Sequence, residues 1–271
     1  MKNATRSAAG LAATAFTATA FAATALTGAA LLSSPALALD TSSLKACGDG
    51  AGWPPYTFEK GGQVQGYDVD VLNAIFGKEG VDVSVAMPPW KRCVLQTKAG
   101  NYDIALSASY SEERDKDFIL TNYYYTLQPS YIYSTSQYPN GLNISTMDDL
   151  NGLRMCGLLG YNYTGFGVDD SKVRKSAKSF DQLVQKTEAG RCDVFLARYE
   201  ILAGFKVAKG TDYLAGGMQA EPIPGNSGDK FHMMISREHP EAMEIKATLD
   251  AGFESMRESG KLQAVLDAYI K

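Results

Sequence analysis

Short apolar runs alternate with segments that carry apolar residues at helical spacing along most of the chain, and this pattern predicts an α/β protein. One clear case follows Gly66, where Val71, Leu72, Ile75 and Phe76 fall on one face of a helix. Glycines and prolines separate the elements. The predicted strands are 44–47, 81–85, 103–107, 118–120, 154–158, 173–177, 193–196 and 231–236, and the predicted helices begin at Gly66 and Arg198 or span 91–99, 179–188, 240–259 and 261–270.

The regions between these elements carry further predictions. Gly61-Gly62 predicts a hairpin turn, and the tyrosine-rich stretch 122–133 predicts an extended passage. Residues 220–230 are rich in proline, glycine and asparagine and predict a linker. The helix over 240–259 is predicted to bury one apolar face, made of Met243, Ile245, Leu249, Phe253 and Met256.

Two ten-residue segments, 97–106 and 187–196, are similar without a gap. They share threonine, alanine, glycine, aspartate and leucine at matching positions. In both, a predicted helix ends at a glycine, and Asp103 or Asp193 then starts a buried strand. Both copies also hold the same place in a strand–helix–strand order. We therefore interpret them as equivalent units of two similar α/β lobes.

The repeat also predicts a domain organisation. We expect lobe 1 to comprise 39–126 and 230–271 and lobe 2 to comprise 130–220. The chain would then cross between the lobes near 126–129 and again near 220–230. Two connections of this kind would form a hinge, with a cleft between the lobes.

Residues 1–38 resemble a secretory signal. Lys2 and Arg6 are the only charges before Asp40, an alanine-rich apolar run follows, and residues 36–38 form an A-x-A cleavage site. We expect cleavage after Ala38 and export to the periplasm, with an uncleaved membrane anchor as the alternative. The mature part has no second long apolar segment, which predicts a soluble protein.

Charge and cysteine content narrow the possible partners. The chain has 26 basic and 30 acidic residues, and removal of Lys2 and Arg6 leaves 24 basic residues and a net charge of −6. This balance disfavours nucleic acid and anionic membranes as partners. No pair of cysteines has C-x-x-C spacing, and the chain has only two histidines, which argues against a zinc or iron–sulfur site. We expect no cofactor.

Four cysteines in an exported chain predict two disulfides, for which three connectivities exist. We expect Cys156 to pair with Cys192, because a doubly wound sheet places the strand after Cys192 beside the strand that holds Cys156. Elimination then pairs Cys47 with Cys93.

The segment 103–114, D-I-A-L-S-A-S-Y-S-E-E-R, changes from a buried strand to hydroxyls and an arginine. In an open α/β sheet, ligands bind beyond the carboxyl ends of the strands, and the fork of donors on Arg114 suits a carboxylate or phosphate. Trp53 lies on a path held extended by two prolines. Each feature has a plain structural interpretation as well: a surface arginine after a strand, and a tryptophan that fills the core.

Four segments in this order resemble the family 3 extracellular solute-binding proteins of bacterial ABC transporters, the polar amino-acid type. Residues 53–58 (W-P-P-Y-T-F) resemble the family's opening aromatic–proline–aromatic motif, and 66–70 (G-Y-D-V-D) its helix start. Residues 103–114 resemble its D…[ST]-x-E-R segment, and 240–270 its C-terminal helix pair. The resemblance spans the mature chain. It implies a two-lobed type II periplasmic-binding-protein fold, with two doubly wound sheets and a two-segment hinge that closes like a flytrap.

The resemblance also implies a ligand site. Arg114 matches the arginine that holds the ligand's α-carboxylate, and Ser107 and Ser109 match neighbouring hydroxyl and backbone donors. Trp53 and Trp90 match two aromatic positions that enclose the ligand side chain, which favours a platform over a core plug.

Lobe 2 contributes to the implied site from two places. Tyr161, Asn162 and Tyr163 match the loop that touches the carboxylate from across the cleft. Arg198 stands where members that bind α-amino acids usually carry an aspartate for the ammonium, and Glu200 follows two residues later. This departure, and a 103–114 stretch one residue shorter than usual, put an ordinary L-amino acid in doubt.

The charge of the ligand therefore stays open. Arg114 and Arg198 together favour an acidic amino acid, a dicarboxylate or another small organic anion. In the alternative, Arg198 turns outward to a surface acid, and Asp49 or Glu200 holds an ammonium. Arg92 adds a further positive group or is simply a solvated surface arginine.

We interpret the protein as a receptor that captures a small carboxylate-bearing ligand and delivers it to an inner-membrane ABC permease. We expect a monomer without enzymatic activity. A periplasmic enzyme resembling cyclohexadienyl dehydratase is the alternative, although neither Asp49 nor Glu200 has an evident proton-transfer partner. A secreted sensor or partner-binding module is the third interpretation.

Overall fold

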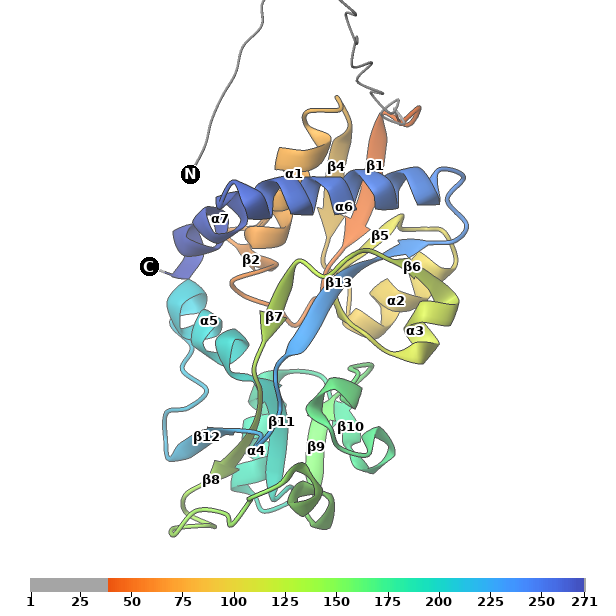
Figure 1. The fold of residues 1–271 in the computed structure, drawn as a ribbon. Coiled ribbons are helices and arrows are strands. Elements are labelled where there is room, and N and C mark those ends of the chain that lie inside the picture. The colour runs from red at the N-terminus through yellow and green to blue at the C-terminus, as the bar shows by residue number, and fades with distance from the viewer. Residues whose placement is uncertain (1–38, 271) are drawn as a thin grey trace, which may run out of the picture. The chain divides into compact units, whose positions relative to one another are not determined.

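The computed structural model describes residues 39–270, which form two main β-sheets and a separate hairpin (Figure 1). The predicted signal peptide lies outside the described residues. Within residues 39–270, no helix is long and apolar enough to cross a membrane. The hairpin turns at Gly61-Gly62, as predicted, and consists of β2 (Phe58–Lys60) and β3 (Gln63–Gln65).

The first sheet has a parallel half and an antiparallel half. β1 pairs in parallel with β4 and β5, whereas β13 pairs antiparallel with β5, β6 and β7. The strand order is β4 (Asp82–Ala86), β1 (Ser43–Cys47), β5 (Ile104–Ser109), β13 (Asp229–Ser236) and β6 (Phe118–Leu120), with β7 (Tyr125–Leu127) on the other part of β13.

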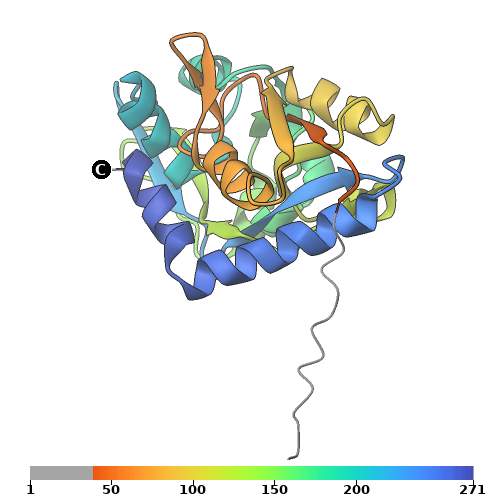
Figure 2. The same ribbon diagram turned by 90° about the horizontal axis from the view of Figure 1, so that it is seen from above.

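Alternation along β5 covers both faces of the first sheet. Ile104 and Leu106 belong to the cluster that includes Val71 of α1 and Phe253 of α6, whereas Ala105 belongs to the cluster of α2. Successive strand side chains point to opposite faces, so the first half of β5, which is buried on both sides, is apolar at each position. Figure 2 shows the long blue helix α6 on one side of the molecule and α2 on the opposite side. The helices are α1 (Tyr67–Phe76), α2 (Trp90–Lys98), α3 (Glu112–Asp117), α6 (Ala242–Glu258) and α7 (Lys261–Ile270).

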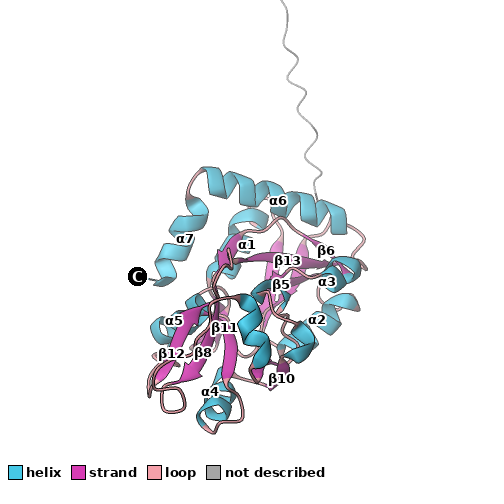
Figure 3. Ribbon diagram, turned by 60° about the horizontal axis from the view of Figure 1, so that its bottom comes forward, coloured by secondary structure: helices cyan, strands magenta, loops and turns pink. Residues whose placement is uncertain are grey.

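The second sheet, like the first, combines parallel and antiparallel strand pairs. β9 pairs in parallel with β10 and β11, and β8 pairs antiparallel with β11 and β12. Figure 3 shows these strands together, with α4 against them. The strand order is β10 (Arg174–Ala177), β9 (Met155–Leu158), β11 (Val194–Arg198), β8 (Pro129–Ser134) and β12 (Met218–Pro222), and the helices are α4 (Phe180–Glu188) and α5 (Tyr199–Lys209).

The main chain passes between the two sheets twice. It leaves the first sheet at β7 and enters β8 two residues later, and it returns between β12 and β13. In Figure 1 the green β7 and the blue β13 run side by side toward the second sheet. The lobe bounds 39–126 with 230–271 and 130–220, and the hinge near 126–129 and 220–230, stay predictions.

Two local predictions are wrong, and one helix was not predicted. Residues 220–222 belong to β12 and 229–230 to β13 rather than to a linker, and Pro222 is tolerated because β12 is an edge strand. α3 was not predicted, because all six of its residues are charged and Ser111 alone marks its start. Met243 is 60% exposed, whereas the other four residues of the predicted apolar face are buried.

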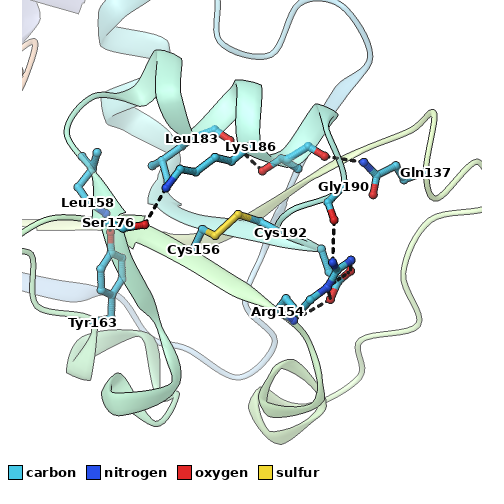
Figure 4. The surroundings of a disulfide bond; sticks show 12 residues. Gln137, Arg154, Cys156, Leu158, Tyr163, Ser176, Leu183, Lys186, Gly190 and Cys192 are labelled. Carbon is cyan, nitrogen blue, oxygen red and sulfur yellow. Dashed lines mark hydrogen bonds and ion pairs between the residues drawn. A yellow bond between two sulfur atoms is a disulfide. The ribbon is translucent and has the colours of Figure 1, made fainter.

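Both predicted disulfides are present. Cys47 of β1 is bonded to Cys93 of α2, with Cα atoms 5.8 Å apart, and Cys156 of β9 is bonded to Cys192, with Cα atoms 5.9 Å apart. Both separations lie within the range of about 7 Å that a disulfide can span. Figure 4 shows the second bridge, which joins β9 to the loop just before β11.

Candidate functional site

One cavity brings together all eight residues predicted to bind a ligand. Its walls come from both sheets. The predicted residues in the lining are Trp53, Trp90, Ser107, Ser109, Arg114, Tyr161, Asn162 and Arg198, and the others are Gly48, Asp49, Thr57, Leu106 and Phe231. Contact with a ligand stays a prediction for each of them.

Arg114 is a buried cation held by the end of β5. Ser111 caps α3 by accepting a hydrogen bond from the main-chain N–H of Arg114, which starts the helix at this point. The Nη1 of Arg114 donates to the carbonyl and Oγ of Ser109 at 2.8 and 3.2 Å. Burial, with the nearby charge of Arg198, lowers the pKa of Arg114 to about 10, so the guanidinium stays charged at neutral pH. Among residues 39–270, no acid forms an ion pair with it.

Ser109 and Asn162 meet across the cavity. The Nδ2 of Asn162, from the loop after β9, donates to Ser109 Oγ at 3.1 Å and to the carbonyl of Tyr110 at 2.6 Å. Ser109 Oγ thus accepts from both Asn162 and Arg114. A hydroxyl has two acceptor lone pairs and one proton, so the proton of Ser109 remains to be donated.

Ser107 belongs to a buried hydrogen-bond chain. Its hydroxyl donates to Asp68 and accepts from Tyr125, whose own oxygen accepts from Trp53 Nε1 at 3.1 Å. Asp68 is fully buried and accepts from three hydroxyls in all, and burial raises its pKa. Ser107 also has a positive φ of 54°, which is uncommon outside glycine. The chain links the cavity wall at Trp53 to the interior of the first sheet.

Arg198 is turned inward and is 2% exposed. It forms a buried ion pair with Asp229 at the start of β13. Its Cζ also lies 4.5 Å from the ring centre of Phe166 and 5.2 Å from that of Phe231, within cation–π range. The alternative in which Arg198 turns outward to a surface acid is therefore wrong. Its Nε has no hydrogen-bond partner among the described residues.

Asp49 is the acid that lines the cavity. It accepts hydrogen bonds from the Tyr161 hydroxyl and, at 2.9 Å, from the main-chain N–H of Ala51. Burial raises its pKa. Trp90, on the same wall, lies 5.6 Å from the Cζ of Arg114.

Three other residues considered from the sequence do not line this cavity. Glu200 accepts from the main-chain N–H of Gln128, between β7 and β8. Tyr163 is buried, and its hydroxyl accepts from the main-chain N–H of Leu158. Arg92 is exposed on α2.

Sequence reasoning missed Asp68 and Asp229 as parts of the site. In the sequence, Asp68 stands out only as part of a helix start. Asp229 lies in the stretch interpreted as a linker, and no local pattern marks it as the partner of Arg198.

The sequence and the fold are similar to those of known proteins. The family described as bacterial extracellular solute-binding proteins, family 3, matches residues 46–271. A protein of Neisseria gonorrhoeae named as a probable histidine-binding protein is 22% identical over 228 residues, which cover 80% of this chain and 79% of that protein.

Two solved structures share the fold. One is the substrate-binding protein of an ABC uptake transporter from Streptococcus pneumoniae with bound histidine, with a TM-score of 0.66 and 19% identity over 84% of this chain and 92% of that chain. The other is the ancestral amino acid-binding protein AncCDT-1, a precursor of cyclohexadienyl dehydratase, with a TM-score of 0.64 and 19% identity over 85% of this chain and 96% of that chain.

These structural likenesses confirm the predicted type II periplasmic-binding-protein fold. The family match covers nearly all of the described residues, including both sheets and the cavity between them. The chain therefore belongs to the bacterial extracellular solute-binding proteins, family 3.

Proposed function

We propose that this protein is a periplasmic receptor that captures a small carboxylate-bearing ligand, an amino acid or a related organic anion, in the cleft between its lobes and delivers it to an inner-membrane ABC permease. Family membership supports the receptor role. The names of the relatives, which refer to histidine and amino acids, support the size and the carboxylate of the ligand.

The observation that carries the proposal is Arg114. It is a buried cation that lines the cavity, and no acid among residues 39–270 forms an ion pair with it. A buried charge without a partner is costly, whereas a guanidinium and a carboxylate form paired, charge-assisted hydrogen bonds. The free proton of Ser109 would add a third donor beside it. A ligand carboxylate would satisfy both groups.

In this proposal, the ligand is captured when the two lobes close over it. Asn162 and Tyr161, on the side of the second sheet, contact Ser109, Tyr110 and Asp49 on the side of the first. A ligand held by Arg114 would lie beneath these contacts, so that release requires the lobes to separate.

The test measures binding by isothermal titration calorimetry with a panel of amino acids and organic acids, after native mass spectrometry has identified any co-purified ligand. We expect Arg114→Met to weaken the best ligand by about 2–5 kcal/mol. Arg92→Met, an exposed arginine on α2, is the matched control and should bind normally. Equal loss in both variants, or no loss in Arg114→Met, would contradict the proposal.

The remaining parts of the proposal have their own tests. Cleavage after Ala38 predicts a mature chain that starts at Leu39, which intact mass measurement of the exported protein would check. Light scattering checks the expected monomer, and co-purification with a permease checks delivery. An enzymatic role is disfavoured because the relatives are named as binding proteins, and incubation with prephenate or arogenate should give no turnover.

A further inference from the structure

The cavity contains a second guanidinium with an unused donor. Arg198 lines the cavity, is 2% exposed, and has no hydrogen-bond partner at Nε within residues 39–270. Its Nη2 donates to Asp229 and, at 3.3 Å, to the carbonyl of Asn162. A buried donor without an acceptor is rare in a folded protein and calls for an explanation. A ligand acceptor would satisfy it.

The charges around Arg198 favour a ligand group that accepts a hydrogen bond over one that is a cation. Asp229 pairs with Arg198 but does not line the cavity. Phe166, Phe231 and Trp53 surround the guanidinium, with ring centres 4.5, 5.2 and 5.8 Å from Cζ. Apart from Asp229, no acid among residues 39–270 forms an ion pair with Arg198.

An ammonium next to Arg198 would be unfavourable for two reasons. It would meet a like charge beside a buried guanidinium, where the effective dielectric constant is low and such repulsion is strong. It would also leave Nε unsatisfied, because an ammonium has donors only. Asp49, the acid in the lining, already accepts from Tyr161 and Ala51.

We propose that Arg198 selects, in the site described above, a carboxylate ligand that carries a hydrogen-bond acceptor oxygen in place of the α-ammonium. The shared chemistry is an acceptor oxygen close to the carboxylate, as in 2-oxo acids, 2-hydroxy acids and short dicarboxylates. Arg114 holds the carboxylate, Nε of Arg198 donates to the second oxygen, and Asp229 positions Arg198. This inference rests on the proposed function and narrows its ligand class.

The first experiment compares ligands that share a carbon skeleton. Calorimetry would measure L-glutamate against 2-oxoglutarate, 2-hydroxyglutarate and glutarate, L-phenylalanine against phenylpyruvate and phenyllactate, and L-alanine against pyruvate and lactate. L-histidine and L-arginine complete the panel. We compare the compounds that share the carbon skeleton of the tightest ligand. Among them, we expect an acid with an acceptor oxygen to bind at least tenfold more tightly than the amino acid.

The outcomes separate this inference from the proposed function. The inference is overturned if the amino acid of that skeleton binds as tightly as its oxo or hydroxy acid, or more tightly. It is also overturned if histidine or arginine binds more tightly than every other compound. Neither result contradicts the proposed receptor for carboxylates. Failure of all these carboxylates to bind would contradict the proposed function itself.

A charge exchange tests the role of Arg198 directly. Arg198→Asp combined with Asp229→Asn replaces the guanidinium at position 198 by a single, shorter carboxylate, without a second buried acid. We expect the ratio of oxo-acid to amino-acid affinity to fall at least tenfold. A ratio cancels any general loss of stability, because both ligands are measured on one variant. An unchanged ratio overturns the inference.

Arg154→Met is the matched control for the charge exchange. Arg154 is also in the lobe of the second sheet and also forms an ion pair, with Asp193, but it does not line the cavity. Its affinity ratio should equal that of the unmodified protein. A shift as large as that of the charge exchange would show that the ratio responds to distant changes, and would overturn the inference.

Discussion

Asp103 and Asp193 make the same contact in the two sheets. Asp103 Oδ2 accepts from the main-chain N–H of Lys45 at 2.7 Å, and Asp193 Oδ2 accepts from that of Arg154 at 2.7 Å. In return, Lys45 and Arg154 each accept from the main-chain N–H of the aspartate. Each aspartate therefore fixes the start of one strand against its parallel neighbour, and the ten-residue repeat in the sequence reflects one structural unit used twice.

The two aspartates differ in their charged partners, which predicts a pH effect. Hydrogen bonds from Arg154 lower the pKa of Asp193 to about 2, against about 3.9 in an unfolded chain. A depressed carboxyl pKa stabilises the fold above about pH 4 and loses this contribution as the pH falls toward 2. We expect Asp193→Asn to lower stability at pH 6 by on the order of 1 kcal/mol, allowing for solvent screening at the partly exposed arginine. Urea unfolding at pH 2.5 and pH 6 should show the two proteins converging at the lower pH. A constant difference would contradict the assignment.

The second disulfide should carry much of the stability of its sheet. Cys156 and Cys192 are separated by 36 positions, and closing a loop of this size contributes roughly 2–4 kcal/mol through the unfolded chain. Replacing both cysteines by serine should lower the free energy of unfolding by that amount. Peptide mapping without reduction should recover the pairs Cys47–Cys93 and Cys156–Cys192. A bridge between the two pairs would refute the connectivity.

Trp53 and Trp90 should report on the ligand, because both line the cavity and the chain has no other tryptophan. Binding should change the tryptophan emission. Each Trp→Ala variant should lose about 1–3 kcal/mol of binding free energy, the scale of a buried aromatic contact. Calorimetry with the ligand of the panel that binds most tightly measures this loss of binding free energy. Normal affinity in both variants would mean that these side chains only fill the core.

Gly204 of α5 should be intolerant of a side chain. A Cβ at this position would meet the carbonyl of Pro54 and, at 2.9 Å, the Cδ of Pro55, next to Trp53. Overpacking of this kind costs about 1–3 kcal/mol, and here it would push α5 away from a segment on the side of the first sheet. We expect Gly204→Ala to weaken ligand binding by that amount. Gly152→Ala, where a Cβ meets no atom within 4 Å, should bind normally.

Much of the fold could be predicted because its elements have local causes. Leu72 and Phe76 give α1 its buried face, and Gly100 and Gly190 end helices with φ of 76° and 66°. The error at Met243 is also local. It lies two positions before Ile245, about 200° around the helix, so it cannot share a face with Ile245, Leu249 and Phe253.

Only those residues of the candidate site that belong to a family motif or to the repeat could be predicted from the sequence. Extended by two residues, the ten-residue repeat aligns Arg198 with Ala108 at the end of the equivalent strand, and the cavity contains Arg198. Its partner Asp229 is 31 residues away in a proline- and glycine-rich stretch. This pairing depends on the path by which the chain returns from the second sheet into β13. No local sequence pattern indicates that path.

The amide of Asn162 bonds to Ser109 and Tyr110 from across the cavity, so the protein itself makes part of the contact between the two walls. Under the proposed function, a carboxylate that accepts the proton of the Ser109 hydroxyl would bind the same oxygen as this amide. The affinity measured for a ligand would then include any change in these two hydrogen bonds. Asn162 would in this way set how much of the closed state is intrinsic to the protein and how much depends on its cargo.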